Sequence, residues 1–123
     1  MEEPSSTLPF RGGDAFDKLL NDYSFETVLD VGSETGLHTR EFLRYGKIVS
    51  SIDLCASDEF TPDHIGDYMT TPYTDKFDAI WCCHVLEHNM DSGAFIRKLY
   101  KDLKLDGVCA ITVPPAKHDI CLL

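Results

Sequence analysis

Short apolar stretches separated by polar segments run along the chain and predict β-strands. They are nearly continuous apolar runs rather than alternating ones, which is typical of strands covered on both faces of a sheet. The run FDAIWCC is the most apolar of them. The predicted strands cover residues 27–32, 47–53, 65–68, 77–83 and 108–114.

Apolar residues with helical spacing lie between several of these strands. One stripe predicts a first helix that Asp14 can cap, and it consists of Phe16, Leu19, Leu20 and Tyr23. A second helix is predicted from Leu37 to Tyr45, with Gly46 as its stop, and a third from a cap at Asp91 to about Leu103. Asp106-Gly107 then predicts a turn before the last strand.

Strands that alternate with helices or short crossovers predict an α/β fold with a parallel sheet and right-handed connections. The 123 residues fit one domain, 1–123, in which residues 1–13 form a loose lead-in rich in Pro and Gly. The strand at 108–114 is expected to be an edge. Because an exposed apolar edge favours pairing with another chain, we expect a homodimer through it, or poor solubility.

Composition narrows the classes of function. The formal net charge of −10 opposes binding along a phosphate backbone, so a nucleic-acid partner is not expected. No apolar run is long enough to span a bilayer, and the acidic start MEEPSSTLPF does not resemble a secretory signal, so we expect a cytoplasmic protein. The five Cys residues include no C-x-x-C pair and are interpreted as reduced thiols.

Candidate chemistry gathers where parallel strands end, because ligands bind beyond the carboxyl ends of the strands in such sheets. The stretch VLDVGSETG places Gly32 and Gly36 after the first strand, where they permit close backbone approach to a ligand. The N–H groups of the following helix can receive an anion. Asp53, about twenty residues on, can accept hydrogen bonds from both hydroxyls of a ribose, or it caps the strand end. Asp67 can accept from an exocyclic amine, or it forms a turn.

The glycine spacing argues against two common nucleotide sites. Gly32 and Gly36 do not form the G-x-G-x-x-G triplet of dinucleotide-binding folds, which disfavours a nicotinamide-dependent oxidoreductase. The chain also lacks the G-x-x-x-x-G-K-[ST] phosphate loop.

Five blocks together resemble a known family. VLDVGSETG, SSID, IGDY, FDAIWCCHVLEH and DGVCAITVPP occur in the order seen in class I S-adenosylmethionine-dependent methyltransferases, particularly the type-11-like group. The resemblance covers roughly residues 25–118. It implies a Rossmann-like sheet of order 3-2-1-4-5, S-adenosylmethionine as cofactor and methyl transfer to an acceptor, for which we expect a small molecule. The family's last two strands are missing, which implies truncation after the fifth strand.

The resemblance also implies a set of cofactor-binding residues. Asp30, Gly32 and Gly36 would surround the methionine portion, Asp53 would hold the ribose, and Leu54 would lie against the adenine. Asp67 and Tyr68 would contact the adenine, and Cys83 and His84 would line the floor near the methyl donor. The loop residues Ser33 and Glu34 belong to the same expected site. A base for the acceptor is expected from His84 or His88, with Glu87 as a further candidate. Glu87 and His88 could instead cap the next helix or bond loop backbone.

Glu34 stands where the family commonly has the middle glycine of D-x-G-x-G-x-G. Its carboxylate could point to solvent, meet the cofactor's ammonium group or oppose the cofactor's carboxylate, and each case predicts a different effect of Glu34→Gly on binding.

Two other interpretations stay open at this stage. HVLEH fits the inverted zinc-protease pattern H-x-x-E-H, but a strand precedes it directly and Asn89-Met90-Asp91 would break its helix, so no metal site is expected. Alternatively, the chain could be a truncated, non-catalytic methyltransferase-like module that serves binding or interaction.

Overall fold

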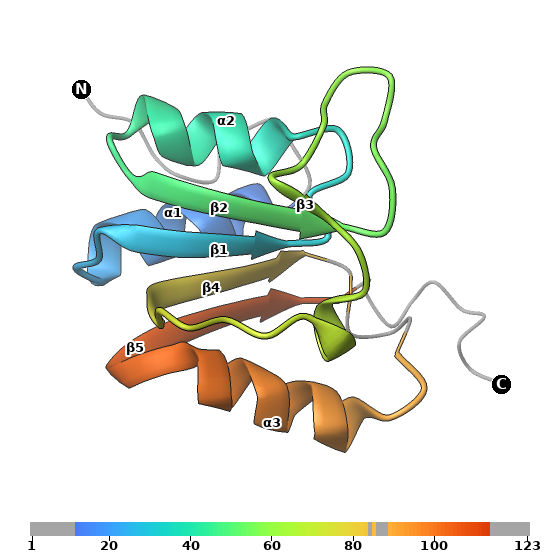
Figure 1. Cartoon of the computed structure of the whole chain (residues 1–123). Coiled ribbons are helices and arrows are strands. Elements are labelled where there is room, and N and C mark those ends of the chain that lie inside the picture. Colours follow the sequence, from blue (N-terminus) through green and yellow to red (C-terminus); the bar gives the residue numbers. More distant parts are fainter. Residues whose placement is uncertain (1–11, 84, 86–88, 114–123) are drawn as a thin grey trace, which may run out of the picture.

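One parallel sheet with helices on both faces makes up the fold (Figure 1). The computed structural model describes residues 12–83, 85 and 89–113, so His84, Glu87 and His88 lie outside the described residues. The elements follow in the order α1 (Gly13–Asp22), β1 (Thr27–Val31), α2 (Leu37–Arg44), β2 (Ile48–Asp53), β3 (His64–Ile65), a 3₁₀ turn (Tyr68–Thr70), β4 (Phe77–Cys83), α3 (Ser92–Asp102) and β5 (Leu103–Thr112).

The strand order is β3-β2-β1-β4-β5, and all neighbouring strands pair in parallel. This confirms the predicted Rossmann-like order. The order reverses between β1 and β4, whose carboxyl ends therefore flank the place where ligands bind in such sheets. All the strands run toward the same edge of the sheet (Figure 1). Within the described residues β5 borders only β4, and the expected homodimer through its edge stays a prediction.

Two apolar clusters fill the two faces of the sheet. α1 and α2 cover one face, where Phe16 and Phe42 pack around Trp81, with the Phe16 and Trp81 ring centroids 5.5 Å apart. α3 and the connection before β4 cover the other face, where Phe95 and Leu99 pack on Ile80. None of the helices in the described ranges has the length and apolar character needed to cross a bilayer.

Three local predictions were wrong. α1 begins at Gly13 with Gly12 as its N-cap, two residues before the expected cap at Asp14, because Gly12 fits against Trp81 and Cys83: an added Cβ would lie 3.0 Å from the Cys83 sulfur. β3 ends at Ile65, because the chain turns into the 3₁₀ turn that Asp67 caps.

The third difference concerns the start of β5. Asp106-Gly107 lies inside the strand, which begins at Leu103, and Asp106 has a φ of 68°. The register of β5 against β4 shifts at this point. Such an irregularity accommodates extra residues without ending the strand.

Asp78 joins the beginnings of β1, β4 and β5. Its carboxylate accepts the N–H groups of Glu26 at 2.9 Å and Thr27 at 3.0 Å, and it lies 3.0 Å from the Lys104 Nζ. These backbone donors, followed by Lys104, lower the pKa of Asp78 well below its usual range. The ionised form is therefore the one that the fold stabilises.

We expect Asp78→Asn to lower the free energy of unfolding by roughly 1–3 kcal/mol at pH 7, because one charge-assisted acceptor is lost. A lowered folded-state pKa stabilises the protein above the unfolded pKa of about 4, and this contribution is lost as the pH falls below that value. Urea unfolding of both proteins from pH 7 to pH 3 should show the difference narrowing toward low pH. A difference that stays constant would contradict this role for the Asp78 charge.

Candidate functional site

The loop between β1 and α2 has a backbone conformation that requires glycine at two positions. Gly32 and Gly36 have φ angles of 78° and 80°, in the left-handed region. A Cβ on Gly32 would lie 2.5 Å from the Val85 side chain, and one on Gly36 would lie 2.3 Å from the Phe60 ring. Neither position could carry a larger side chain without moving its neighbour. Glu34 takes the same left-handed region, with a φ of 48°, at the position where the family commonly has glycine.

Hydrogen bonds attach this loop to the end of β2. The Gly32 N–H donates to the Ile52 carbonyl at 2.8 Å, and the Glu34 N–H donates to the Asp53 carboxylate at 2.7 Å. The other Asp53 oxygen accepts the Leu54 N–H at 2.6 Å. Asp53 therefore caps its strand end, as one interpretation expected, while it also faces a hollow.

The larger of two neighbouring hollows lies over the carboxyl ends of β1 and β2 and has a volume of about 440 Å³. It brings together six of the predicted residues, namely Gly32, Glu34, Asp53, Leu54, Asp67 and Tyr68. Asp67 also caps the 3₁₀ turn, because one of its carboxylate oxygens accepts the Met69 N–H at 2.9 Å. The walls are apolar except for the carboxylates of Glu34, Asp53 and Asp67 and the amide of Asn89.

The smaller hollow lies on the other side of the loop and has a volume of about 290 Å³. The predicted residues Ser33 and Cys83 line it together with His38 from the first turn of α2. Gly32 and Glu34 line both hollows and form their common wall. The Ser33 hydroxyl is buried and finds no hydrogen-bond partner among the described residues. A buried polar atom of this kind indicates a site that a ligand can satisfy.

Two predicted residues line neither hollow. Asp30 is fully buried beneath the loop, where the Thr39 hydroxyl donates to its carboxylate at 2.7 Å, so it ties the end of β1 to α2. Gly36 is the buried N-cap of α2 and lies against Phe60. Both residues shape the loop from below.

Sequence reasoning missed part of the lining. Val85, Asn89, Met90 and Phe95 follow β4 and complete the larger hollow, and His38 belongs to the smaller one. The signal for the first group was their position after a strand that ends at the same sheet edge. His38 carried the weaker signal of lying in the first helical turn after the loop.

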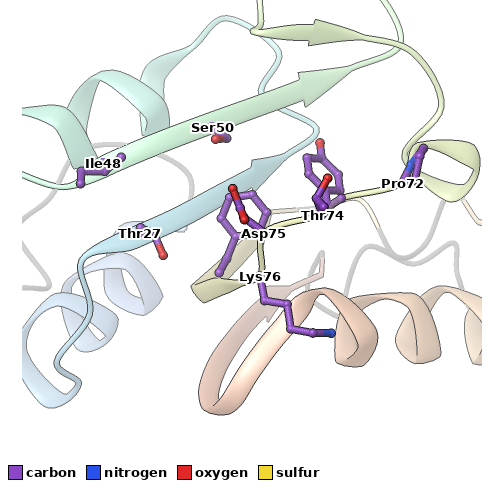
Figure 2. A pocket seen from close by; sticks show the side chains of 9 residues that line it. Thr27, Ile48, Ser50, Pro72, Thr74, Asp75 and Lys76 are labelled. Atoms are coloured by element: carbon purple, nitrogen blue, oxygen red, sulfur yellow. The ribbon is translucent and has the colours of Figure 1, made fainter.

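A third hollow, of about 390 Å³, lies near the opposite ends of the strands (Figure 2). Thr27 and Ile48, at the starts of β1 and β2, line it together with Lys76, just before β4. It contains none of the predicted site residues. The described part of the chain holds no group of three or more His, Cys, Asp or Glu side chains that could bind a metal ion.

A family model described as "Methyltransferase domain", of type 11, matches residues 29–111, more than half of the chain. The chain belongs to this methyltransferase family. The match contains the end of β1, the glycine loop, β2 and β4, which contribute residues to both hollows. Among curated proteins, no sequence matches significantly.

Solved structures share the fold of this methyltransferase domain. It resembles Streptomyces venezuelae DesVI, with 18% identity and a TM-score of 0.68 over 85% of this chain and 50% of that one. It resembles the sugar N-methyltransferase KedS8 from Streptoalloteichus, with 21% identity and a TM-score of 0.61 over 73% of this chain and 41% of that one.

A third structure is the 1,6-didemethyltoxoflavin-N1-methyltransferase of Burkholderia thailandensis, which holds bound 1,6-didemethyltoxoflavin and S-adenosylhomocysteine. It shows 23% identity and a TM-score of 0.60 over 69% of this chain and 43% of that one. The methyltransferase domain described here thus spans about half the length of the structures it resembles.

The pKa of Asp30 is raised to about 7, mainly by burial and to a smaller extent by the nearby carboxylates of Asp53 and Glu34, while the hydrogen bond from Thr39 opposes the shift. A raised carboxyl pKa means that the unfolded chain loses this proton near pH 4 and the folded domain loses it near pH 7. Unfolding therefore releases a proton between these values, and stability falls as the pH rises through that window.

Asp30→Asn should remove this dependence. We expect the free energy of unfolding of the natural domain, measured with urea between pH 4.5 and 6.5, to decline by up to about 1.4 kcal/mol per pH unit relative to that of the variant. Parallel pH profiles for the two proteins would show that Asp30 is already ionised in the fold.

Glu34→Gly tests the cost of the left-handed backbone. The left-handed region costs an L-residue roughly 1–2 kcal/mol, which glycine would avoid. The greater freedom of glycine in the unfolded chain offsets part of this stabilisation. We expect a net stabilisation of about 0.5–1 kcal/mol in urea unfolding. Glu34→Gln, which keeps the Cβ and removes only the charge, is the matched control and should not reproduce this gain. An equal gain in both variants would assign the effect to charge instead.

Proposed function

We propose that this methyltransferase domain binds S-adenosylmethionine across the two neighbouring hollows and takes part in methyl transfer to a small-molecule acceptor. The observation that carries the proposal is the continuous wall of Gly32 and Glu34 between a hollow edged by Asp53 and a hollow that contains the Ser33 hydroxyl. An elongated ligand with a nucleoside at one end and an amino acid at the other matches this arrangement.

The described residues fit such a cofactor. Gly32 permits close backbone approach at the common wall, where a Cβ would already meet Val85. Asp53 keeps acceptor capacity for ribose hydroxyls, because each carboxylate oxygen has two lone pairs and each now accepts one backbone N–H. Leu54, Asp67 and Tyr68 lie beyond it in the same hollow, where the adenine would fit.

The smaller hollow suits the amino-acid end. Ser33 offers a buried hydroxyl that can donate to a carboxylate. The N-terminal N–H groups of α2 lie beside this hollow, since His38 and Leu37 line it, and a helix N-terminus favours an anion. The buried aromatic packing of His38 on Trp81, with ring centroids 5.0 Å apart, holds this first turn in place.

When bound, S-adenosylmethionine supplies an electrophilic methyl group on a sulfonium. The chain's contribution is to bind and orient, and positioning alone can provide about 7–11 kcal/mol of the acceleration in favourable cases. Cys83 lines the smaller hollow, and the family resemblance implies that the methyl donor lies near it. His84 and His88, which follow Cys83 closely, are proposed to face the acceptor and to accept its proton where the acceptor needs a base.

Two further observations support the proposal. Solved structures of similar fold hold this cofactor or its product, including the amino pentose methyltransferase CalS10 from Micromonospora echinaspora and the 1,6-didemethyltoxoflavin-N1-methyltransferase described above. The acceptors named for these proteins are small molecules. This domain spans about half the length of those chains.

Cofactor binding is the direct test. We expect S-adenosylmethionine at 100 times its Kd to stabilise the domain by about 2.7 kcal/mol in thermal or urea unfolding. Asp53→Ala should weaken binding by about 10- to 100-fold, because hydrogen bonds to a charged group are lost. Asp58→Ala, on an exposed part of the loop that follows, is the control and should bind normally. The absence of any shift at millimolar ligand would rule out the cofactor site and favour a non-catalytic module.

A further inference from the structure

Tyr68 forms part of the wall of the larger hollow, but few backbone contacts hold it there. β3, the strand just before it, has two residues, and Tyr68 begins a 3₁₀ turn of three. A segment this short cannot fix an aromatic ring by its own hydrogen bonds. The ring is nevertheless buried, with 6% of its surface exposed, so other elements must hold it.

Side chains of α3 provide those contacts. The Tyr68 hydroxyl donates to the Asp102 carboxylate at 2.6 Å, across 34 positions of sequence. The Lys98 Nζ lies 2.8 Å from the same carboxylate oxygen and 4.4 Å from the centroid of the Tyr68 ring. Phe95, which also lines the hollow, meets the ring edge to face with centroids 5.8 Å apart. The three residues occupy one face of α3, spaced by three and four positions.

The network is buried and electrically balanced. Asp102 is 2% exposed, and Lys98 is its ion-pair partner. A buried carboxylate is tolerated when it is paired and hydrogen-bonded, and removing one partner of such a pair is costly. Burial, followed by the hydrogen bond to Asp102, raises the pKa of Tyr68 well above its usual range, so the phenol stays a donor. Its orientation is thus fixed by a charge-assisted hydrogen bond.

We propose that Lys98 and Asp102 are positioning residues that hold the Tyr68 ring as the adenine wall of the cofactor site. This inference rests on the proposed function and deepens it, since it assigns a binding role to a helix end that touches neither hollow. α3 then serves two purposes: it covers the sheet and, through a single carboxylate, sets one wall of the nucleoside pocket.

The test compares Tyr68→Phe and Asp102→Asn with the natural domain. Both variants keep the shape of the side chain; the first removes the donor and the second removes the charge. We expect each to raise the calorimetric Kd of S-adenosylhomocysteine about tenfold. The Kd of 5′-methylthioadenosine, which lacks the amino-acid end, should rise by the same factor, because the disturbed wall faces the nucleoside.

The control is Asp22→Asn on α1. Lys18 and Asp22 form a pair with the same spacing and the same 2.8 Å separation, but both are exposed and neither lines either hollow. The variant should bind both ligands as the natural domain does. Unfolding by urea, measured alongside, separates a change in stability from a change in affinity. If Asp102→Asn does not fold, Tyr68→Phe carries the test.

Two results would overturn the proposal. Reduced stability with an unchanged Kd for both ligands would show that the network is purely structural. A loss of affinity confined to S-adenosylhomocysteine would show that the network acts on the amino-acid end of the cofactor. Failure of the natural domain to bind either ligand would instead be a failure of the proposed function, and the wall would then have no adenine to face.

Discussion

The attachment of the glycine loop to the end of β2 is the constraint on which the rest of the site depends. The hydrogen bonding of β1 with β2 continues past the last residue of β1, since Gly32 and Ser33 both donate to the Ile52 carbonyl. The Asp53 carboxylate then takes over the role of the next carbonyl by accepting the Glu34 N–H. The loop is therefore held against two strand ends before any ligand arrives, and one carboxylate both shapes the site and edges it.

This attachment also explains the unusual residue at position 34. A left-handed backbone there directs the Glu34 N–H at Asp53, and glycine would meet the requirement without steric cost. Glutamate at this position keeps the backbone strain and adds a third carboxylate near Asp30 and Asp53. The charge of Glu34 contributes to the raised pKa of Asp30. A cluster of negatively charged carboxylates suits a ligand with a net positive charge. S-adenosylmethionine carries such a charge because of its sulfonium.

The positions of the strands could be predicted because they depend on local patterns: short apolar runs, glycine after the first run and acidic residues at strand ends. Their order in the sheet was implied by the family resemblance. Prediction failed where a distant contact decided the local structure. Gly12, and not Asp14, caps α1 because Trp81 and Cys83 leave room for no side chain at that point. The third strand is shorter than its apolar pattern suggested, because Tyr68 turns inward to reach Asp102. No residue near Tyr68 in the sequence indicates a hydrogen-bond partner 34 positions away.

The two hollows differ in what makes them rigid. The smaller one rests on the aromatic packing of Phe16, His38 and Trp81, which is held by the face of the sheet under α1 and α2. The larger one shares the apolar packing of Val31, Ile52 and Phe95, and it depends in addition on a short turn and on the polar contacts of Tyr68 to α3, which have a fixed direction and few neighbours to replace them. Apolar packing spreads its energy over many contacts, whereas a buried ion pair loses most of its value when one partner changes. Nucleoside binding should therefore be more sensitive to single substitutions than binding of the amino-acid end, even though both lie on the same glycine loop.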